Sequence, residues 1–133
     1  MTALTHSTQT DSLLRLAMRA DAVLTGVTGV LGVPLAGWLA QTSGTTVAFE
    51  KGMAAFYVAY GVVVFALTAL PSVRIAGMAV IIANVAYTAG AVALVLAGVF
   101  PLTTLGVVLI LASGVYTLAF AELQYVGWRR ASA

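Results

Sequence analysis

The chain has 133 residues, of which 62% are hydrophobic and only 8% are charged, whereas a soluble domain usually carries about a quarter charged residues. So few charges cannot solvate the surface of a water-soluble fold, and a formal net charge of +2 is too small to indicate a nucleic-acid-binding protein. Cysteine is absent, which excludes disulfides, thiolate nucleophiles and thiolate metal sites. The composition therefore predicts an integral membrane protein, with lipid as its solvent.

The N-terminal segment is polar and shows no helical periodicity. Residues 1–11 are therefore expected to form a disordered tail, and Asp11 or Ser12 is expected to cap the first helix. His6 is the only histidine, so it has no second imidazole with which to share a metal ion, and we expect no metal site and no cofactor. A cleaved signal peptide is the alternative for this end of the chain, but its apolar region would be only about 7–15 residues long.

Four apolar runs follow, each close to the roughly 20 residues that cross a hydrocarbon core of about 30 Å. The first contains Pro34, which should kink it. A polar loop is expected from Gln41 to Lys51, and Pro101 suits the first turn of the last helix. Together the runs predict an all-α membrane protein, a four-helix transmembrane bundle with one domain over residues 12–130. The predicted spans cover about residues 18–40, 52–70, 73–97 and 102–126.

Charge placement predicts the orientation of the bundle. With four spans, both termini and the second connection share one side of the membrane. Lys51 is the one cation on the other side. Because cytoplasmic segments carry the excess of Lys and Arg, we expect both termini in the cytoplasm of a bacterial cell, with the bundle in its plasma membrane. The cations on the terminal side are Arg15, Arg19, Arg74, Arg129 and Arg130.

Small residues recur at heptad spacing in three of the spans, which predicts left-handed packing of closely approaching helices. The fourth span shows the same pattern more weakly, through Gly106, Ile110, Ser113 and Thr117. The stripes expected to face the bundle interior are Ala22, Gly26, Gly29, Val33, Ala36 and Ala40; Ala55, Ala59, Val62, Ala66 and Ala69; and Ala79, Ala83, Ala86, Gly90, Ala93 and Ala97.

Ionisable residues predict a cluster near the cytoplasmic interface. Counting about 1.5 Å per residue from the helix ends places Asp21 and Glu122 at the depth of Arg19 and Arg74. We expect ion pairs that tie helix ends together. The alternative is that either acid carries a proton or a cation, because an ionisable group in a span is a functional candidate.

A second polar layer is expected near the midplane, with one residue from each helix. Asn84, the only asparagine, needs hydrogen-bond partners in hydrocarbon and should face inward. The layer is expected either to fix the packing of the helices or to form the floor of a pocket for a small lipophilic ligand. Its members are Thr28, Tyr60, Asn84 and Ser113, with Tyr116 one turn away.

Two short motifs carry a resemblance. The string from Phe120 to Tyr125 is followed by Gly127 and the pair Arg129–Arg130, and the segment from Leu16 to Asp21 opens the first span. Both resemble small four-span membrane proteins of actinobacteria and related bacteria. The resemblance implies fold and location rather than chemistry, and it adds Gln124 to a recurring cytoplasmic-side cluster with Asp21 and Glu122. DoxX-like proteins are similar in architecture only, and small multidrug transporters are similar in size but carry their carboxylate deeper in the first helix.

Two functions fit these observations. The first is an accessory or interaction subunit that binds other membrane proteins or a second copy of itself, since helix packing alone explains the few polar residues in the spans. The second is a carrier or binder of a small hydrophobic or cationic molecule inside the bundle. We do not expect an enzyme, because catalysis of acyl or phosphoryl transfer needs a nucleophile, a base or a metal site that these spans do not supply.

Overall fold

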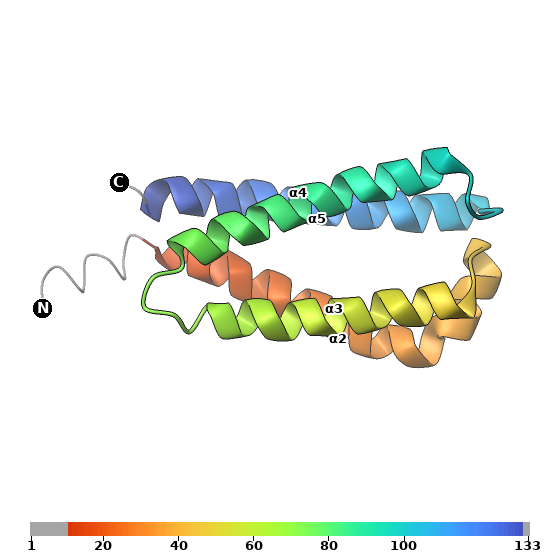
Figure 1. Cartoon of the computed structure of the whole chain (residues 1–133), viewed down its shortest axis with the longest axis horizontal. Coiled ribbons are helices and arrows are strands. Elements are labelled where there is room, and N and C mark those ends of the chain that lie inside the picture. The colour runs from red at the N-terminus through yellow and green to blue at the C-terminus, as the bar shows by residue number, and fades with distance from the viewer. Residues whose placement is uncertain (1–10, 132–133) are drawn as a thin grey trace, which may run out of the picture.

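The computed structural model describes residues 11–131, and these form four helices, each long and apolar enough to cross a membrane. The prediction of an all-α four-helix bundle is confirmed. His6 and all but the last residue of the predicted tail lie outside the described residues. The helices are α2 (Ser12–Ser43), α3 (Val47–Leu67), α4 (Arg74–Ala97) and α5 (Thr104–Ala131) (Figure 1).

The connection between α2 and α3 is much shorter than the predicted loop. Gly44 ends α2 in the left-handed conformation, with φ of 81°, which glycine adopts without steric cost. The Thr46 hydroxyl then accepts a hydrogen bond of 3.1 Å from the Phe49 N–H group and caps α3. The expected loop over 41–51 is thus wrong, because two compact caps replace it and both helices extend into its range.

The other two connections are also held by specific hydrogen bonds. Pro101 does not begin α5; instead, the Thr103 hydroxyl accepts from the Gly106 N–H group at 3.0 Å and starts the helix at the next residue. At the connection between α3 and α4, the Arg15 guanidinium donates to the carbonyl oxygens of Thr68 and Leu70 at 2.6 and 2.7 Å. Arg15 therefore ties the start of α2 to the end of α3.

The four helices do not contact one another evenly. α2 lies along α3 and α5, and α4 lies along α5, whereas α3 and α4 lie apart. Figure 1 shows the start of α2, the end of α5 and the α3–α4 connection at one end of the molecule, which we call the terminal end. The α2–α3 and α4–α5 connections lie at the opposite end, which we call the distal end. The bundle thus has an open side between α3 and α4.

The helix faces that pack together match the prediction only in part. On α2, Ala22, Gly29, Ala36 and Ala40 of the predicted stripe are buried. The predicted stripes of α3 and α4 do not pack against neighbouring helices, since all of their members are exposed, although Ala83 and Gly90 of α4 border cavities between the helices. Asn84 supplies the physical reason for α4, because the helix rotates to bury this amide and leaves the alanine stripe exposed. The faces buried instead are Ala54, Gly61 and Val64 on α3 and Gly77, Val80, Ile81, Asn84 and Ala91 on α4.

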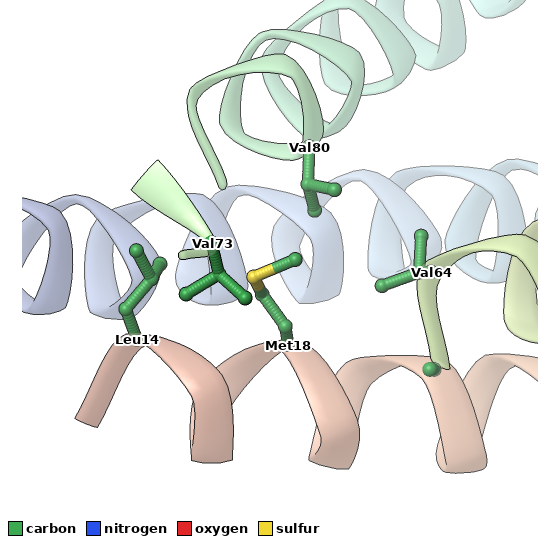
Figure 2. Packing of buried hydrophobic residues seen from close by; sticks show 6 residues of the cluster. Leu14, Met18, Val64, Val73 and Val80 are labelled. Carbon is green, nitrogen blue, oxygen red and sulfur yellow. The ribbon is translucent and has the colours of Figure 1, made fainter. Parts of the chain in front are cut away.

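A hydrophobic cluster fills the terminal end of the bundle (Figure 2). Leu14 is fully buried beside Gly77 and Gly127; a Cβ atom added at Gly127 would lie 2.7 Å from the Leu14 backbone nitrogen. Trp128 and Leu67 cover the cluster from outside. This end of the bundle is therefore closed by close-packed apolar side chains. The cluster consists of Leu14, Met18, Ala22, Val64, Val73 and Val80.

Candidate functional site

Asp21 is fully buried inside the bundle, and its carboxylate accepts hydrogen bonds from all four helices. Oδ2 accepts from the Tyr60 hydroxyl at 2.7 Å and from Asn84 Nδ2 and Gln124 Nε2 at 3.0 Å each. Oδ1 accepts from the hydroxyls of Thr25 at 3.0 Å and Tyr116 at 3.3 Å. We call these residues the Asp21 network. Every partner acts as a donor, which is the pattern that an acceptor-only carboxylate requires.

The Asp21 network contains no positive charge. A buried carboxylate is costly unless hydrogen bonds or an opposite charge compensate it, and here neutral hydroxyl and amide groups supply the compensation. Asn84 and Gln124 also bond to each other, through Nδ2 and Oε1 at 2.9 Å, so the network is fully connected. The carboxyl group of Asp21 therefore lies in the middle of the bundle with no cationic side chain among its hydrogen-bond partners.

The predicted cytoplasmic ion cluster is not formed. Neither Arg19 nor Arg74 makes a salt bridge with Asp21 or Glu122. Arg19 Nε instead donates to the Thr68 hydroxyl at 3.1 Å, and the Arg74 guanidinium stacks 4.0 Å from the centre of the Trp128 ring. Glu122 is exposed on the outer face of α5. Of the five residues expected in the cluster, only Asp21 and Gln124 come together.

The predicted ion cluster is wrong because Asp21 lies deeper in the bundle than residue counting placed it. Counting from a span that begins near residue 18 places Asp21 at the interface, but α2 begins at Ser12. At about 1.5 Å per residue, the two extra turns sink Asp21 to the level of Asn84, which lies equally far into α4. The two polar layers expected at different depths are therefore one layer.

The predicted midplane layer is assembled in part. Tyr60, Asn84 and Tyr116 all belong to the Asp21 network. Ser113 lies farther toward the distal end, where its hydroxyl accepts from Tyr87 at 3.0 Å. Thr28 donates back to the Leu24 carbonyl of its own helix at 2.7 Å and makes no bond across the layer.

A cavity of about 260 Å³ lies directly beside the Asp21 network. Four of its lining residues, Thr25, Tyr60, Asn84 and Tyr116, are donors to Asp21, so the carboxylate stands just behind the cavity wall. Five aromatic rings surround the space, and they include four of the five tyrosines of the chain. We call it the aromatic cavity, and its rings are Phe56, Tyr57, Tyr60, Tyr87 and Tyr116.

A second cavity, of about 470 Å³, continues from the first toward the distal end. Glu50 is the one ionisable carboxylate among its lining residues, and the Thr45 hydroxyl donates to it at 2.6 Å. The two cavities share Thr28, Tyr57, Tyr87 and Ser113. We call the second space the distal cavity.

Several residues of the site were not predicted, namely Thr25, Phe56, Tyr57, Tyr87 and Glu50. The tyrosines could have been identified from their positions in the sequence. Tyrosine normally lies at the membrane interface, whereas these residues lie well inside their spans. The spacing of Tyr57 and Tyr60, three residues apart, also places both rings on one face of α3. Thr25 lies four residues after Asp21 and shares its face in the same way.

Comparisons of the chain with models of protein families, with curated proteins and with solved structures find no match. Among residues 11–131, no group of His, Cys, Asp and Glu side chains could hold a metal ion. The fold and the site therefore define the class on their own: a multi-pass membrane protein, built as a four-helix bundle with a buried carboxylate beside an aromatic cavity.

Proposed function

We propose that this protein binds or carries a small organic cation in the aromatic cavity. The single observation that supports this most is the set of five aromatic rings around a space whose wall is backed by the Asp21 carboxylate. Aromatic faces attract cations through their negative quadrupole, and such rings recognise quaternary ammonium groups. The Asp21 charge, which has no cationic partner, adds to this attraction in a medium that screens charge weakly.

The volume of the cavity limits the size of the ligand. An apolar cavity of about 150 Å³ holds a benzene molecule, so a space of about 260 Å³ accommodates one substituted ring or a compact group of alkyl chains. The hydroxyls of Tyr60, Tyr116 and Thr25 already donate to Asp21, so few free polar groups remain in the wall. The class of ligand that fits is a small cation with an apolar body.

The proposal is tested by binding to the purified protein in lipid nanodiscs, measured by isothermal titration calorimetry. Phenyltrimethylammonium is the probe, and its neutral isostere tert-butylbenzene and the anion benzenesulfonate are the controls. We expect the cation to bind about tenfold or more tightly than the neutral isostere, with no binding of the anion. Equal binding of the cation and the neutral isostere would contradict the proposal.

For location we propose the plasma membrane of a bacterium, with the terminal end in the cytoplasm. Support comes from the charges, since five arginines belong to the terminal end and Lys51 to the distal end. A single cysteine placed at Ala131 should then be protected from a membrane-impermeant thiol reagent in intact cells and react after lysis. Labelling in intact cells would contradict this orientation and place the terminal end outside the cytoplasm.

An accessory role in a larger membrane complex is the second candidate. It is favoured by the exposed alanine-rich stripe of α3, because small residues at heptad spacing let another helix approach closely in lipid. This reading expects the protein, extracted in mild detergent and examined by native mass spectrometry, to carry other membrane subunits or a second copy of itself. A lone monomer would count against it.

A further inference from the structure

The two cavities meet at a hydrogen-bonded chain of hydroxyl groups that crosses the open side of the bundle. The hydroxyls of Tyr57 on α3 and Tyr87 on α4 are bonded to each other. Tyr87 also donates to the Ser113 hydroxyl on α5 at 3.0 Å, and Ser113 donates to the Ile110 carbonyl at 2.6 Å. We call Tyr57, Tyr87 and Ser113 the hydroxyl bridge. All three residues line both cavities, so the bridge is the boundary between them.

The terminal end offers no second way into the aromatic cavity. Between the Asp21 network and that end lies the hydrophobic cluster, in which Leu14, Met18 and Val73 have no exposed surface (Figure 2). A charged molecule crossing this cluster would lose its hydration without gaining a partner. Within the described residues, the space that adjoins the aromatic cavity on the side away from this cluster is the distal cavity, with which it shares Tyr57, Tyr87 and Ser113.

The distal cavity is suited to a cation. It is larger than the aromatic cavity, at about 470 Å³ against about 260 Å³, and its one ionisable carboxylate belongs to Glu50 near the distal end. A single acidic group in a concave, weakly polar space attracts cations and repels anions. Glu50 in the wall of the distal cavity and Asp21 behind the wall of the aromatic cavity thus place a carboxyl group near each end of the joined cavities.

We infer that the distal cavity is an access site for the same class of organic cation, and that the hydroxyl bridge is a gate between this site and the aromatic cavity. The inference rests on the proposed function and adds a route and a control point to it. The bridge suits a gate because α3 and α4 lie apart along most of their length, so rotation of two tyrosine side chains opens the passage without separating packed helices. The broken bond joins neutral hydroxyls, which are the weaker class of hydrogen-bonding partners.

Thiol labelling tests the gate without any ligand, because the chain has no cysteine of its own. A cysteine at Thr117 reports on the aromatic cavity and a cysteine at Met53 on the distal cavity, since each residue lines the respective space. The protein is held in nanodiscs, where lipid covers the open side, and is treated with a trimethylammonium-ethyl methanethiosulfonate or its sulfonate counterpart. The rates are compared between the parent and the Tyr57→Phe/Tyr87→Phe double variant.

We expect the Met53→Cys thiol to react at the same rate in both backgrounds. The Thr117→Cys thiol should react about tenfold or more faster in the double variant, and with the cationic reagent only. Tyr125→Phe, which removes the hydroxyl of the tyrosine outside the cavities, should change neither rate. Ser113→Ala removes the acceptor of Tyr87 and provides a second, milder opening of the bridge if the double variant folds poorly.

Three results would overturn the inference. The first is a Thr117→Cys rate that neither the double variant nor Ser113→Ala changes. The second is equal reaction with the anionic reagent, which would remove the role of Glu50. The third is rapid labelling only by an uncharged, lipid-soluble maleimide, which would place access on the open side between α3 and α4. If the Thr117→Cys thiol reacts as expected but calorimetry shows no preference for the cation, the proposed function is refuted instead.

Discussion

At the scale of single residues, Asp21 determines how the interior is arranged. Its two carboxylate oxygens accept five hydrogen bonds, and the donors come from every helix of the bundle. These bonds join a residue of α2 to residues of α3, α4 and α5, so one side chain links all four helices at a single level. The same bonds hold the rings of Tyr60 and Tyr116 at the wall of the aromatic cavity.

Gln124 and Glu122 provide a matched test at this scale, since they lie two residues apart on α5 and point to opposite sides. Gln124→Leu removes the bonds to Asp21 and Asn84, and we expect it to lower stability by about 1–2 kcal/mol, because one interhelical bond in a membrane contributes about 0.6 kcal/mol on average and buried groups left unpaired cost more. The measurement is the unfolding temperature in nanodiscs. Glu122→Gln, on the exposed face, should leave that temperature unchanged, and an equal loss in both variants would contradict the assignment.

The sequence predicted some of these residues and not others, for physical reasons. Asn84 was expected to face inward because an amide in hydrocarbon needs partners, and its partners confirm this. The depth of Asp21 could not be counted correctly, since the polar residues before Leu16 hide the true start of α2. The pairing of Tyr57 with Tyr87 depends on the relative rotation of α3 and α4, which local sequence does not determine.

At the scale of the elements, the most extensive close packing lies between α2 and α3. A Cβ atom added at Gly61 would lie 2.7 Å from the Ala22 carbonyl oxygen and 2.8 Å from Gly26 Cα. A Cβ atom added at Gly29 would likewise lie 2.6 Å from the Ala54 carbonyl oxygen of α3. Close approach of backbones replaces the hydrophobic effect as the force that holds helices together in lipid.

This packing predicts a large difference between two glycines of α3. Gly61→Ala forces α2 and α3 apart, and we expect a loss of about 1–3 kcal/mol, typical of overpacking. Gly52→Ala, on the same helix, has nothing within 4 Å of the added Cβ and should not lower stability. Thermal unfolding of both variants in the same nanodiscs makes the comparison, and a neutral Gly61→Ala would show that the contact is looser than described.

The element scale also shows what a pattern of small residues can predict. The stripe on α2 was correct for Ala22, Gly29, Ala36 and Ala40, which are buried, and wrong for Val33, which is exposed. On α4, alanine and glycine occupy several faces, so the stripe through Ala83 and Ala86 is not unique. The buried polar residue next to it, Asn84, decides which face turns inward.

At the scale of the whole molecule, the bundle is closed at one end and open along one side. The hydrophobic cluster closes the terminal end, while α3 and α4 lie apart and leave room for two connected cavities. A bundle that served only to pack would be expected to fill this space, because empty volume forfeits dispersion contacts. The cavities therefore favour binding within the bundle as the function.

Asp21→Asn tests the central claim most directly, because it removes the charge and keeps the shape. The asparagine oxygen can accept from Tyr60, Asn84 and Gln124, and its amide group can donate to the hydroxyls of Thr25 and Tyr116, so the fold should be retained. The measurement is the affinity for phenyltrimethylammonium by calorimetry, with the unfolding temperature as the control for folding. The account predicts an affinity about tenfold or more lower than that of the parent protein at a similar unfolding temperature. An unchanged affinity in a folded Asp21→Asn protein would show that the buried carboxylate serves structure alone.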